Sequence, residues 1–314
     1  MARRQKGRRI DGVFLLDKPQ GLTSNSALQR VKRLYGAAKA GHTGALDPLA
    51  TGLLPICLGE ATKFSQFLLE SDKRYITTAK LGIRTDSSDA DGEVIETKAV
   101  PVIERDALDR LLQRRFSGNI EQVPSMFSAL KHKGEPLYKL ARRGESVEVK
   151  PRRVTIYEIK LLALRADEID LEVHCSKGTY IRSIVEDLGL ELGCGAHVSM
   201  LRRTAVASYE SDQMLTLEQL NELAQPRVAD DGEGCIQTRL DALLLPPWSA
   251  VDTLPLLNLP TDLATRLLQG QRLGETFSER GLVRLFADSV FLGMGEVDDE
   301  GRLRARRLLD TSEH

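Results

Sequence analysis

The spacing of apolar residues changes repeatedly along this chain between the two-residue period of a strand and the longer period of a helix. Apolar and polar residues alternate from Ile169 to Cys175 and nearly so from Lys73 to Leu81, which predicts half-buried strands. The apolar runs 12–17 and 53–58 predict buried strands. Helical spacing recurs in segments 24–35, 60–71, 108–116, 179–188 and 217–223. Thr23 or Ser24 is the expected cap of the first of these helices, and Thr179 is the expected cap of the fourth. The chain is therefore predicted to have a mixed α+β fold with a largely antiparallel central sheet.

The pattern changes after a proline-rich connector, Pro246-Pro247-Trp248, which predicts a stiff linker. Beyond it we expect a short helix at 261–269 and two β-hairpins, one at 281–293 and one at 295–309. The predicted organisation is a basic, disordered tail at 1–9, a large domain at 10–248 and a small β-rich domain at 249–314.

The charge of the chain is almost balanced. Its 314 residues are 41% hydrophobic and 28% charged, and the formal net charge is -1. A generally basic nucleic-acid binder is thereby disfavoured, so any contact with RNA must come from local clusters. Such clusters lie near both ends of the chain and in segment 123–153, where eight Lys or Arg stand against three Glu.

Segment 123–153 also interleaves Phe127, Leu137 and Tyr138 with its charges. Lysine and arginine contact phosphates, while aromatic side chains stack on bases or wedge between them. The segment is therefore predicted either to grip RNA or to be a plain surface hairpin.

Other motifs exclude several classes of protein. The four cysteines fall singly, which argues against a disulfide framework or a zinc site. The acidic turn 82–93 superficially suggests a calcium loop. With Gly92 in the sixth place, however, the first ligand would be Ser87 and the twelfth Lys98, so the site fails at both ends and we expect a connecting loop. No apolar run approaches transmembrane length, and the first is too short for a signal peptide. We expect a cytoplasmic protein with no metal, no cofactor and no membrane segment.

The stretch most suggestive of chemistry is the loop 41–55. It holds three glycines, two prolines, one histidine and a single acid, Asp47, directly before Pro48. Proline restricts the preceding residue, so the loop aims this carboxylate and suits it to nucleophilic or general-base work. The alternative is an ordinary Asp-Pro turn.

This loop resembles the active-site motif of pseudouridine synthases of the TruB family, which modify the T loop of tRNA. Other segments resemble further blocks of that family in the same order: Asp17-Lys18-Pro19-Gln20-Gly21, Lys73-Arg74-Tyr75, Cys175-Ser176-Lys177-Gly178-Thr179-Tyr180-Ile181-Arg182 and Leu201-Arg202-Arg203. The resemblance runs from about Gly12 to the C-terminus. It implies a catalytic domain of the pseudouridine synthase fold with a mobile thumb at 123–153, followed by a PUA-type RNA-binding barrel. A capping domain without RNA contact is the alternative for the barrel.

The resemblance also implies the catalytic residues. Asp47 is the essential carboxylate, Arg182 orients it and keeps it ionised, and Tyr75 supplies an aromatic ring and a hydroxyl near the base. From the residues alone, Arg182 lies off the apolar stripe of its helix, in a first turn where the helix dipole disfavours a cation. A partner carboxylate or plain exposure to solvent would each account for it. Tyr75, as a strand tyrosine, has core packing as its alternative role.

Four further residues are implied as substrate contacts. Leu201 forms an apolar wall for the uracil, while His42 and Tyr180 contact the flipped nucleotide or its surroundings. Lys63 assists RNA or active-site contacts. Without the resemblance, His42 is an exposed loop histidine and Lys63 a solvated helix lysine.

The implied reaction converts the uridine at position 55 of tRNA to pseudouridine. It needs no redox step, energy source or metal, and the carboxylate either attacks C1′ or takes a ribose proton on the way to a glycal. The expected partner is the T stem-loop of tRNA, bound by a monomer. Two rivals remain: a non-catalytic RNA chaperone and a guide-RNA-dependent synthase. A phosphate-binding hydrolase, suggested by the glycines of 41–44, is disfavoured because the P-loop lysine spacing is lacking.

Overall fold

The computed structural model of the chain describes residues 7–128, 130–141, 143–145, 147–226 and 233–310. Of the predicted tail 1–9, residues 1–6 lie outside these ranges. Arg8 is anchored, because its guanidinium forms an ion pair with Asp241 at 2.6 Å. Among the helices of the described ranges, none is both long and apolar enough to span a membrane.

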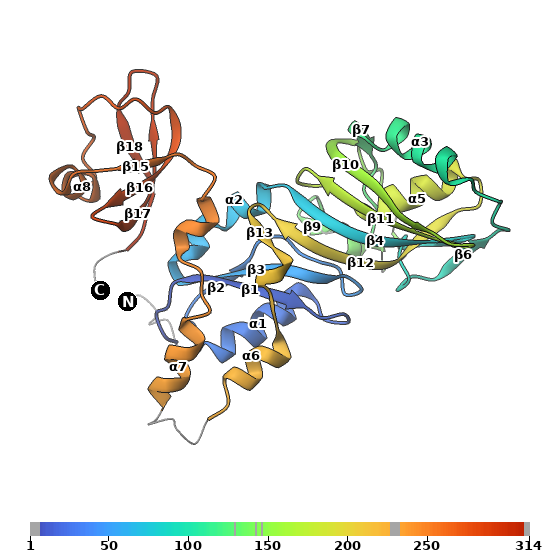
Figure 1. Ribbon diagram of the computed structural model, residues 1–314, viewed down its shortest axis with the longest axis horizontal. Helices are drawn as coiled ribbons and strands as arrows, with labels where there is room; N and C mark the ends of the chain where they lie inside the picture. The colour runs from blue at the N-terminus through green and yellow to red at the C-terminus, as the bar shows by residue number, and fades with distance from the viewer. Residues whose placement is uncertain (1–6, 129, 142, 146, 227–232, 311–314) are drawn as a thin grey trace.

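A ten-stranded sheet forms the body of the molecule (Figure 1). In spatial order its strands are β14 (Leu215–Thr216), β1 (Gly12–Lys18), β3 (Thr51–Leu58), β12 (Ala196–Val206), β4 (Lys73–Leu81), β11 (Glu168–Cys175), β10 (Arg152–Leu164) and β7 (Gly118–Gln122), with β2 (Ala40–His42) beside β3 and β13 (Tyr209–Glu210) beside β12. Within the described ranges, the parallel pairs of this sheet are β1 with β14 and β3 with β12. The predicted mixed α+β fold with a largely antiparallel sheet is confirmed.

Helices cover this sheet at both ends. They are α1 (Ser24–Leu34), α3 (Arg105–Arg115), α5 (Ile181–Glu191), α6 (Leu217–Leu223) and α7 (Glu233–Asp241), with the short turns η1 (Gly59–Phe64), α2 (Ser65–Glu70), η2 (Ser211–Gln213) and η3 (Pro247–Val251). Figure 1 shows α1 and α6 together below β1, and α3 and α5 together at the far end of the sheet. One hydrophobic core runs beneath both groups, so the two ends form a continuous body.

Two of the predicted helices differ in detail. The segment 60–71, predicted as one helix, is a 3-10 helix followed by the single α-helical segment α2. The predicted cap of α5 by Thr179 is wrong, because Tyr180 occupies the N-cap position and Thr179 donates its hydroxyl hydrogen bond to the Ser176 carbonyl at 2.9 Å. The predicted cap of α1 is confirmed: the side chain of Thr23 accepts from the Ser26 backbone N–H at 3.1 Å.

The C-terminal segment forms its own sheet around its own core. Its elements are β15 (Leu256–Asn258), α8 (Thr261–Leu268), β16 (Gly281–Ala287), β17 (Val290–Val297) and β18 (Leu303–Leu308), with strand order β15-β16-β17-β18. A β-rich C-terminal domain was predicted and is present, but the two expected hairpins share one continuous strand, β17. The Phe64 and Phe291 rings, 5.4 Å apart, join this domain to the body.

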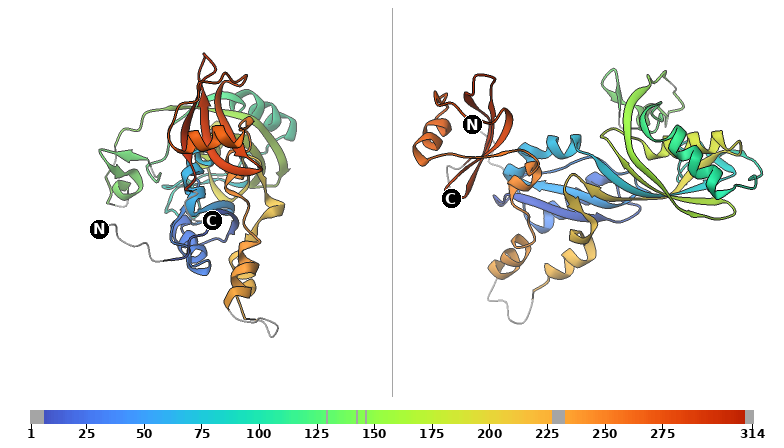
Figure 2. Two further views of the ribbon diagram at one scale, coloured as in Figure 1. Left: turned by 90° about the vertical axis from the view of Figure 1, so that its left-hand side faces the viewer. Right: turned by 45° about the horizontal axis from the view of Figure 1, so that its top comes forward.

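The small elements lie outside the main sheet. They are the hairpin of β5 (Ile83–Thr85) with β6 (Val94–Thr97), and the segment of β8 (Lys131–His132), β9 (Glu135–Pro136) and α4 (Leu137–Ala141). Figure 2 shows that the segment of β8, β9 and α4 projects from the body. We call residues 123–153 the thumb, and both its boundaries and those of the domains remain predictions.

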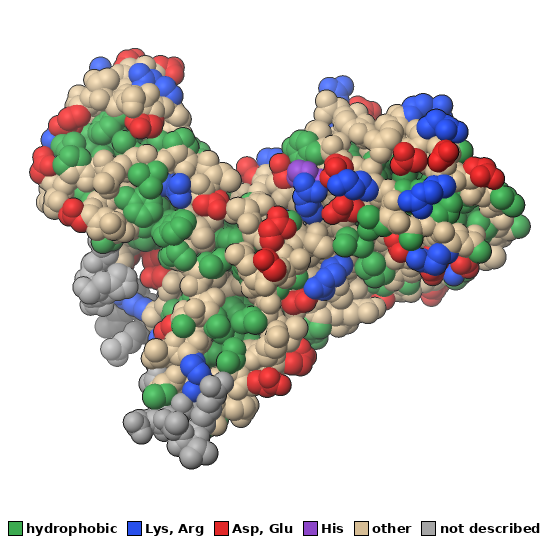
Figure 3. Space-filling view, in the orientation of Figure 1, with side chains coloured by type: hydrophobic (Ala, Val, Ile, Leu, Met, Phe, Trp, Pro, Cys, Tyr) green, Lys and Arg blue, Asp and Glu red, His purple; other side chains and the backbone are tan. Residues whose placement is uncertain are grey.

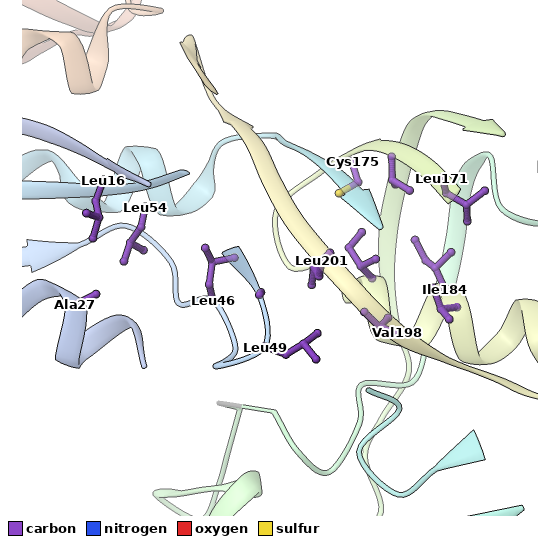
Figure 4. Close-up of a cluster of buried hydrophobic side chains, with 14 of the residues drawn as sticks. Leu16, Ala27, Leu46, Leu49, Leu54, Leu171, Cys175, Ile184, Val198 and Leu201 are labelled. Carbon is purple, nitrogen blue, oxygen red and sulfur yellow. The ribbon is translucent and has the colours of Figure 1, made fainter. Parts of the chain in front are cut away.

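The loop between β2 and β3 is part of the main core. Leu46 and Leu49 are about 95% buried, and Figure 4 shows them between Ala27 of α1 and Leu201 of β12. Apolar contacts on both sides therefore fix the loop between the two groups of helices.

Gly52 offers a test of this packing. It is the second residue of β3, has φ +95° and lies between Lys18 of β1 and Arg203 of β12. A Cβ there would come within 2.2 Å of the Arg203 carbonyl oxygen. We expect Gly52→Ala to lower the free energy of unfolding by about 3 kcal/mol or more, from backbone strain and overpacking together. Urea titration followed by circular dichroism measures this loss.

The matched control is Gly21→Ala, which shares a positive φ, +82°, but has no heavy atom within 4 Å of the added Cβ. Strain alone costs about 1–2 kcal/mol there. Equal losses in the two variants would show that close strand packing at Gly52 contributes nothing.

Candidate active site

Asp47 lies in a loop whose backbone is tied down on both sides. The buried Ser24 hydroxyl, at the start of α1, donates to the Leu46 carbonyl at 3.0 Å and accepts from the Leu46 N–H at 2.7 Å. The Gly21 N–H donates to the Pro48 carbonyl at 2.8 Å, and the Ala50 N–H to the Asp47 carbonyl at 3.1 Å. The loop therefore fixes the direction in which the carboxylate points.

The carboxylate of Asp47 forms an ion pair with Arg182, whose Nε lies 3.0 Å from Oδ2. Arg182 stands in the first turn of α5 with only 5% of its side chain exposed, so it does not reach solvent. The ion pair implied by the resemblance is thus present. Its formation explains how a cation is tolerated at a helix N-terminus.

Arg182 has further partners from two other segments. Its Nη1 lies 3.4 Å from the carboxylate of Asp89 and donates to the Ser87 carbonyl at 3.0 Å, while Nη2 donates to the Phe127 carbonyl at 3.0 Å. One guanidinium therefore joins the loop, the acidic turn, the base of the thumb and α5.

These groups border a pocket of about 260 Å³. Its lining residues come from the loop, α2, β4, the thumb, the turn before α5, α5 itself and β12: Gly44, Ala45, Leu46, Asp47, Leu69, Lys73, Tyr75, Ser128, Ser176, Gly178, Thr179, Tyr180, Ile181, Arg182, Leu201 and Arg203. Five of the predicted site residues, namely Asp47, Tyr75, Tyr180, Arg182 and Leu201, are thus brought together.

The surroundings of Asp47 act on its pKa in opposite directions. Burial in the pocket wall raises the pKa, the Arg182 guanidinium lowers it, and the nearby Asp89 carboxylate raises it again. The net effect is a raised pKa, although 40% of the side chain remains exposed toward the open pocket. Asp47 therefore becomes ionised at a higher pH than an ordinary aspartate.

Tyr75 and Leu201 form the wall on the sheet side. Tyr75 is half-buried on β4, while Leu201 is 7% exposed on the neighbouring β12. Burial raises the pKa of the Tyr75 hydroxyl, and the neighbouring Arg203 guanidinium opposes this rise. This wall combines an aromatic ring, a protonated hydroxyl and an apolar surface.

Tyr180 connects the pocket to the thumb. Its backbone N–H donates to the Gln122 side chain at 3.1 Å, and its carbonyl accepts from the same amide at 3.2 Å. The next turn of α5 is tied as well, since the Ser183 hydroxyl donates to the Val123 carbonyl at 3.1 Å. The base of the thumb is thereby fixed to the helix that carries Arg182.

Two predicted residues stand apart from this pocket. His42 is half-buried in β2, outside the lining set, and its Nδ1 has no hydrogen-bond partner in the described ranges. Lys63 forms an ion pair with Glu60 and donates to the Leu308 carbonyl at 2.8 Å. It therefore fastens the C-terminal strand to η1, and its implied contact with RNA stays a prediction.

Sequence reasoning missed the importance of Asp89 and Arg203. The acidic turn 82–93 was interpreted as a connecting loop, yet Asp89 is 5% exposed and faces Arg182. Arg203 was noted only within a motif, yet it is 2% exposed and lines the pocket. The three aspartates in one short turn were the available signal for Asp89, whereas nothing in the spacing distinguished Arg203 from Arg202.

Comparison with known proteins identifies the family. Residues 32–181 match the model of the TruB family pseudouridylate synthase N-terminal domain. A tRNA pseudouridine synthase B of Vibrio cholerae is 56% identical over 314 residues, which cover 98% of this chain and 99% of that protein. The chain belongs to the TruB family. Another family member, the tRNA pseudouridine synthase B of Tolumonas auensis, is 56% identical over 98% of this chain and 94% of its own length.

The rest of the TruB match covers the C-terminal part. Residues 182–252 match the tRNA pseudouridylate synthase B C-terminal domain, and residues 255–309 match the pseudouridine synthase II TruB C-terminal model. Among solved structures, an H/ACA RNP bound to a substrate RNA aligns with a TM-score of 0.72 at 22% identity, over all of this chain and 92% of the other. A Cbf5-Nop10-Gar1 complex aligns with a TM-score of 0.70 at 26% identity, over 92% and 79% of the two chains. The TruB chain and these proteins share one fold.

The charge cluster predicts a pH effect. Since the Asp89 carboxylate raises the pKa of Asp47, replacing it by a neutral amide in Asp89→Asn lowers that pKa and leaves Asp47 as the carboxylate paired with Arg182. On the prediction that Asp47 is the catalytic residue and acts as a carboxylate, the fall in first-turnover rate on acidification then begins at a lower pH. First-turnover rates on a tRNA transcript between pH 4.5 and 8 measure this.

Asp91→Asn is the matched control, because Asp91 raises the pKa of Asp47 less than Asp89 does. Its profile should move less in the same direction. A profile of Asp89→Asn that stays in place or moves to higher pH would contradict the proposed coupling.

Proposed function

We propose that this TruB protein converts the uridine at position 55 of the tRNA T loop to pseudouridine, with Asp47 as the essential carboxylate. The observation that carries the proposal is the Asp47–Arg182 ion pair at the wall of a pocket lined by Tyr75 and Leu201. The relatives named tRNA pseudouridine synthase B, matched over nearly their whole length, support tRNA as the substrate.

The pocket is suited to one flipped nucleoside. Its volume, about 260 Å³, lies just below the range of about 300–1,000 Å³ usual for small-molecule pockets. A uridine must leave its stack to enter, at a cost of a few kcal/mol that protein contacts offset. Tyr75 and Leu201 hold the base, and Tyr180 contacts the nucleotide from the start of α5.

Asp47 acts at the ribose of the bound nucleoside. The C1′–N1 bond breaks, the uracil turns in the pocket, and C5 joins C1′ while its proton leaves to solvent and N1 gains one. The Asp47 carboxylate assists these bond changes either by attacking C1′ or by removing a ribose proton. Arg182, held by Asp89 and two carbonyls, keeps Asp47 ionised and aimed in both routes.

The thumb grips the T stem-loop in this proposal. Lys131, Lys133 and Lys139 are exposed there, and no ion pair engages them within the described ranges. By contrast, Figure 3 shows acidic and basic side chains interspersed over the face where β4, β10 and β11 lie, and Lys160 on that face pairs with Glu158 at 2.9 Å. Unpaired cations are the ones free to contact phosphates.

We further propose that the protein works as a monomer in the cytoplasm. His42 reaches the RNA beside the flipped nucleotide, from β2 at the start of the loop. The C-terminal domain at 249–314 adds a PUA-type RNA contact.

The decisive experiment is tritium release from a tRNA transcript labelled at uridine C5, with no guide RNA present. We expect release by the purified chain, and a loss of at least about a thousandfold in Asp47→Asn, the scale on which removing a catalytic group acts. The affinity of that variant for tRNA should stay within a few-fold of the parent. Tight binding without release by either protein would favour the chaperone or the guide-dependent synthase.

The thumb lysines give a second test. In a variant with Lys131→Ala, Lys133→Ala and Lys139→Ala, we expect weaker tRNA binding and a slope of log affinity against log salt that is smaller by about 2. First-turnover rates at saturating enzyme should change little, because these side chains do not line the pocket. Lys160→Ala, whose lysine is already paired, serves as the control, and an equal effect there would remove the thumb from the proposal.

A further inference from the structure

Arg203 is a second buried guanidinium that lines the pocket, in addition to Arg182. It projects from β12 with 2% of its surface exposed, and it lines the pocket together with Tyr75 and Leu201. Its Nε donates to the Leu53 carbonyl at 2.7 Å and its Nη2 to the Gly44 carbonyl at 3.1 Å. An arginine side chain carries five N–H donors, so these two bonds and the interaction with the Tyr75 hydroxyl leave at least one donor for a further acceptor.

The charge of Arg203 has no counter-ion in the described part of the chain. Arg182 faces two carboxylates, and the neighbouring Arg202 forms a 2.7 Å ion pair with Asp17. Arg203 has only carbonyl oxygens and the Tyr75 hydroxyl. An unpaired buried charge is costly, and its cost falls when an anion enters beside it.

The proposed reaction creates such an anion. When the C1′–N1 bond breaks, its electron pair goes to N1, and the detached uracil carries one negative charge spread over N1, O2 and O4. The charge disappears when C5 bonds to C1′, C5 loses its proton and N1 gains one. Between these events the base lies against Tyr75 and Leu201, on the wall that Arg203 completes.

We propose that Arg203 offsets the negative charge of the detached uracil and so stabilises the intermediate between bond breaking and bond making. This inference rests on the proposed function. The two arginines then have separate roles, since Arg182 acts on the Asp47 carboxylate and Arg203 acts on the detached uracil. Preorganised positive charge at a site of developing negative charge is among the largest sources of rate enhancement.

The test compares two leaving groups in the same variant. A 5-fluorouracil anion is intrinsically more stable than a uracil anion, so a tRNA with 5-fluorouridine at the target depends less on help from Arg203. We measure first-turnover rates of rearrangement for both tRNAs and take the ratio of the 5-fluorouridine rate to the uridine rate. Because both rates come from one protein sample, any loss of folded enzyme cancels in the ratio.

We expect Arg203→Gln to slow the uridine substrate by about a hundredfold or more, as loss of one charge-stabilising donor does. The ratio should then rise about tenfold over that of the parent protein. Equal slowing of both substrates would make Arg203 purely structural, and unchanged rates would also overturn the proposal. Arg202→Gln is the matched control, in which the ratio should equal that of the parent.

Arg203→Lys covers the case in which the glutamine variant does not fold. A lysine there is buried and faces Lys73 and Tyr75 of β4, His42 of β2 and Lys18 of β1, so it loses its proton as pH rises. For Arg203→Lys we take the ratio of the 5-fluorouridine rate to the uridine rate and divide it by the same ratio for the parent protein at the same pH. This quotient should rise between pH 7 and 9.5. A flat profile would refute the proposal, whereas failure of the parent protein to rearrange either tRNA would instead refute the proposed function.

Discussion

The ion pair between Asp47 and Arg182 is the contact on which the active site depends. Arg182 is 5% exposed, and such a group is tolerated inside a protein only when its charge and its donors are satisfied. Its partners come from the loop, from the acidic turn through Asp89 and from the thumb through Phe127. Loss of any one of these segments would leave some donors of the buried Arg182 guanidinium without a partner, so the site forms as a unit.

The loop that carries Asp47 is rigid because the core holds it, in addition to its own glycines and prolines. Leu46 and Leu49 are buried, and the Ser24 hydroxyl holds the Leu46 backbone through both its carbonyl and its N–H. The energetic support of the site is therefore the same hydrophobic core that packs α1 against the sheet. A carboxylate supported in this way needs little reorganisation when substrate binds.

Buried charge in this molecule gathers at the proposed active site. The net charge of the whole chain is only -1, yet the pocket brings Asp47, Lys73, Arg182 and Arg203 into one lining. Burial lowers the pKa of Lys73 to about 8, and its ammonium is held by carbonyls at the end of α2. On the sheet face, by contrast, charges of opposite sign pair with one another and remain exposed to solvent, where they contribute little.

The sequence alone determined the class of fold, the strands of strict alternation and the loop motif around Asp47, because periodicity and turn chemistry are local properties. The family blocks also placed Asp47, Tyr75, Tyr180, Arg182 and Leu201 in one site, and these five do line one pocket. Only the tertiary structure revealed Asp89 beside Arg182, Lys63 at the C-terminal strand, and Arg203 without a counter-ion among the described residues. Burial and charge pairing depend on segments far apart in the chain, which local pattern does not record.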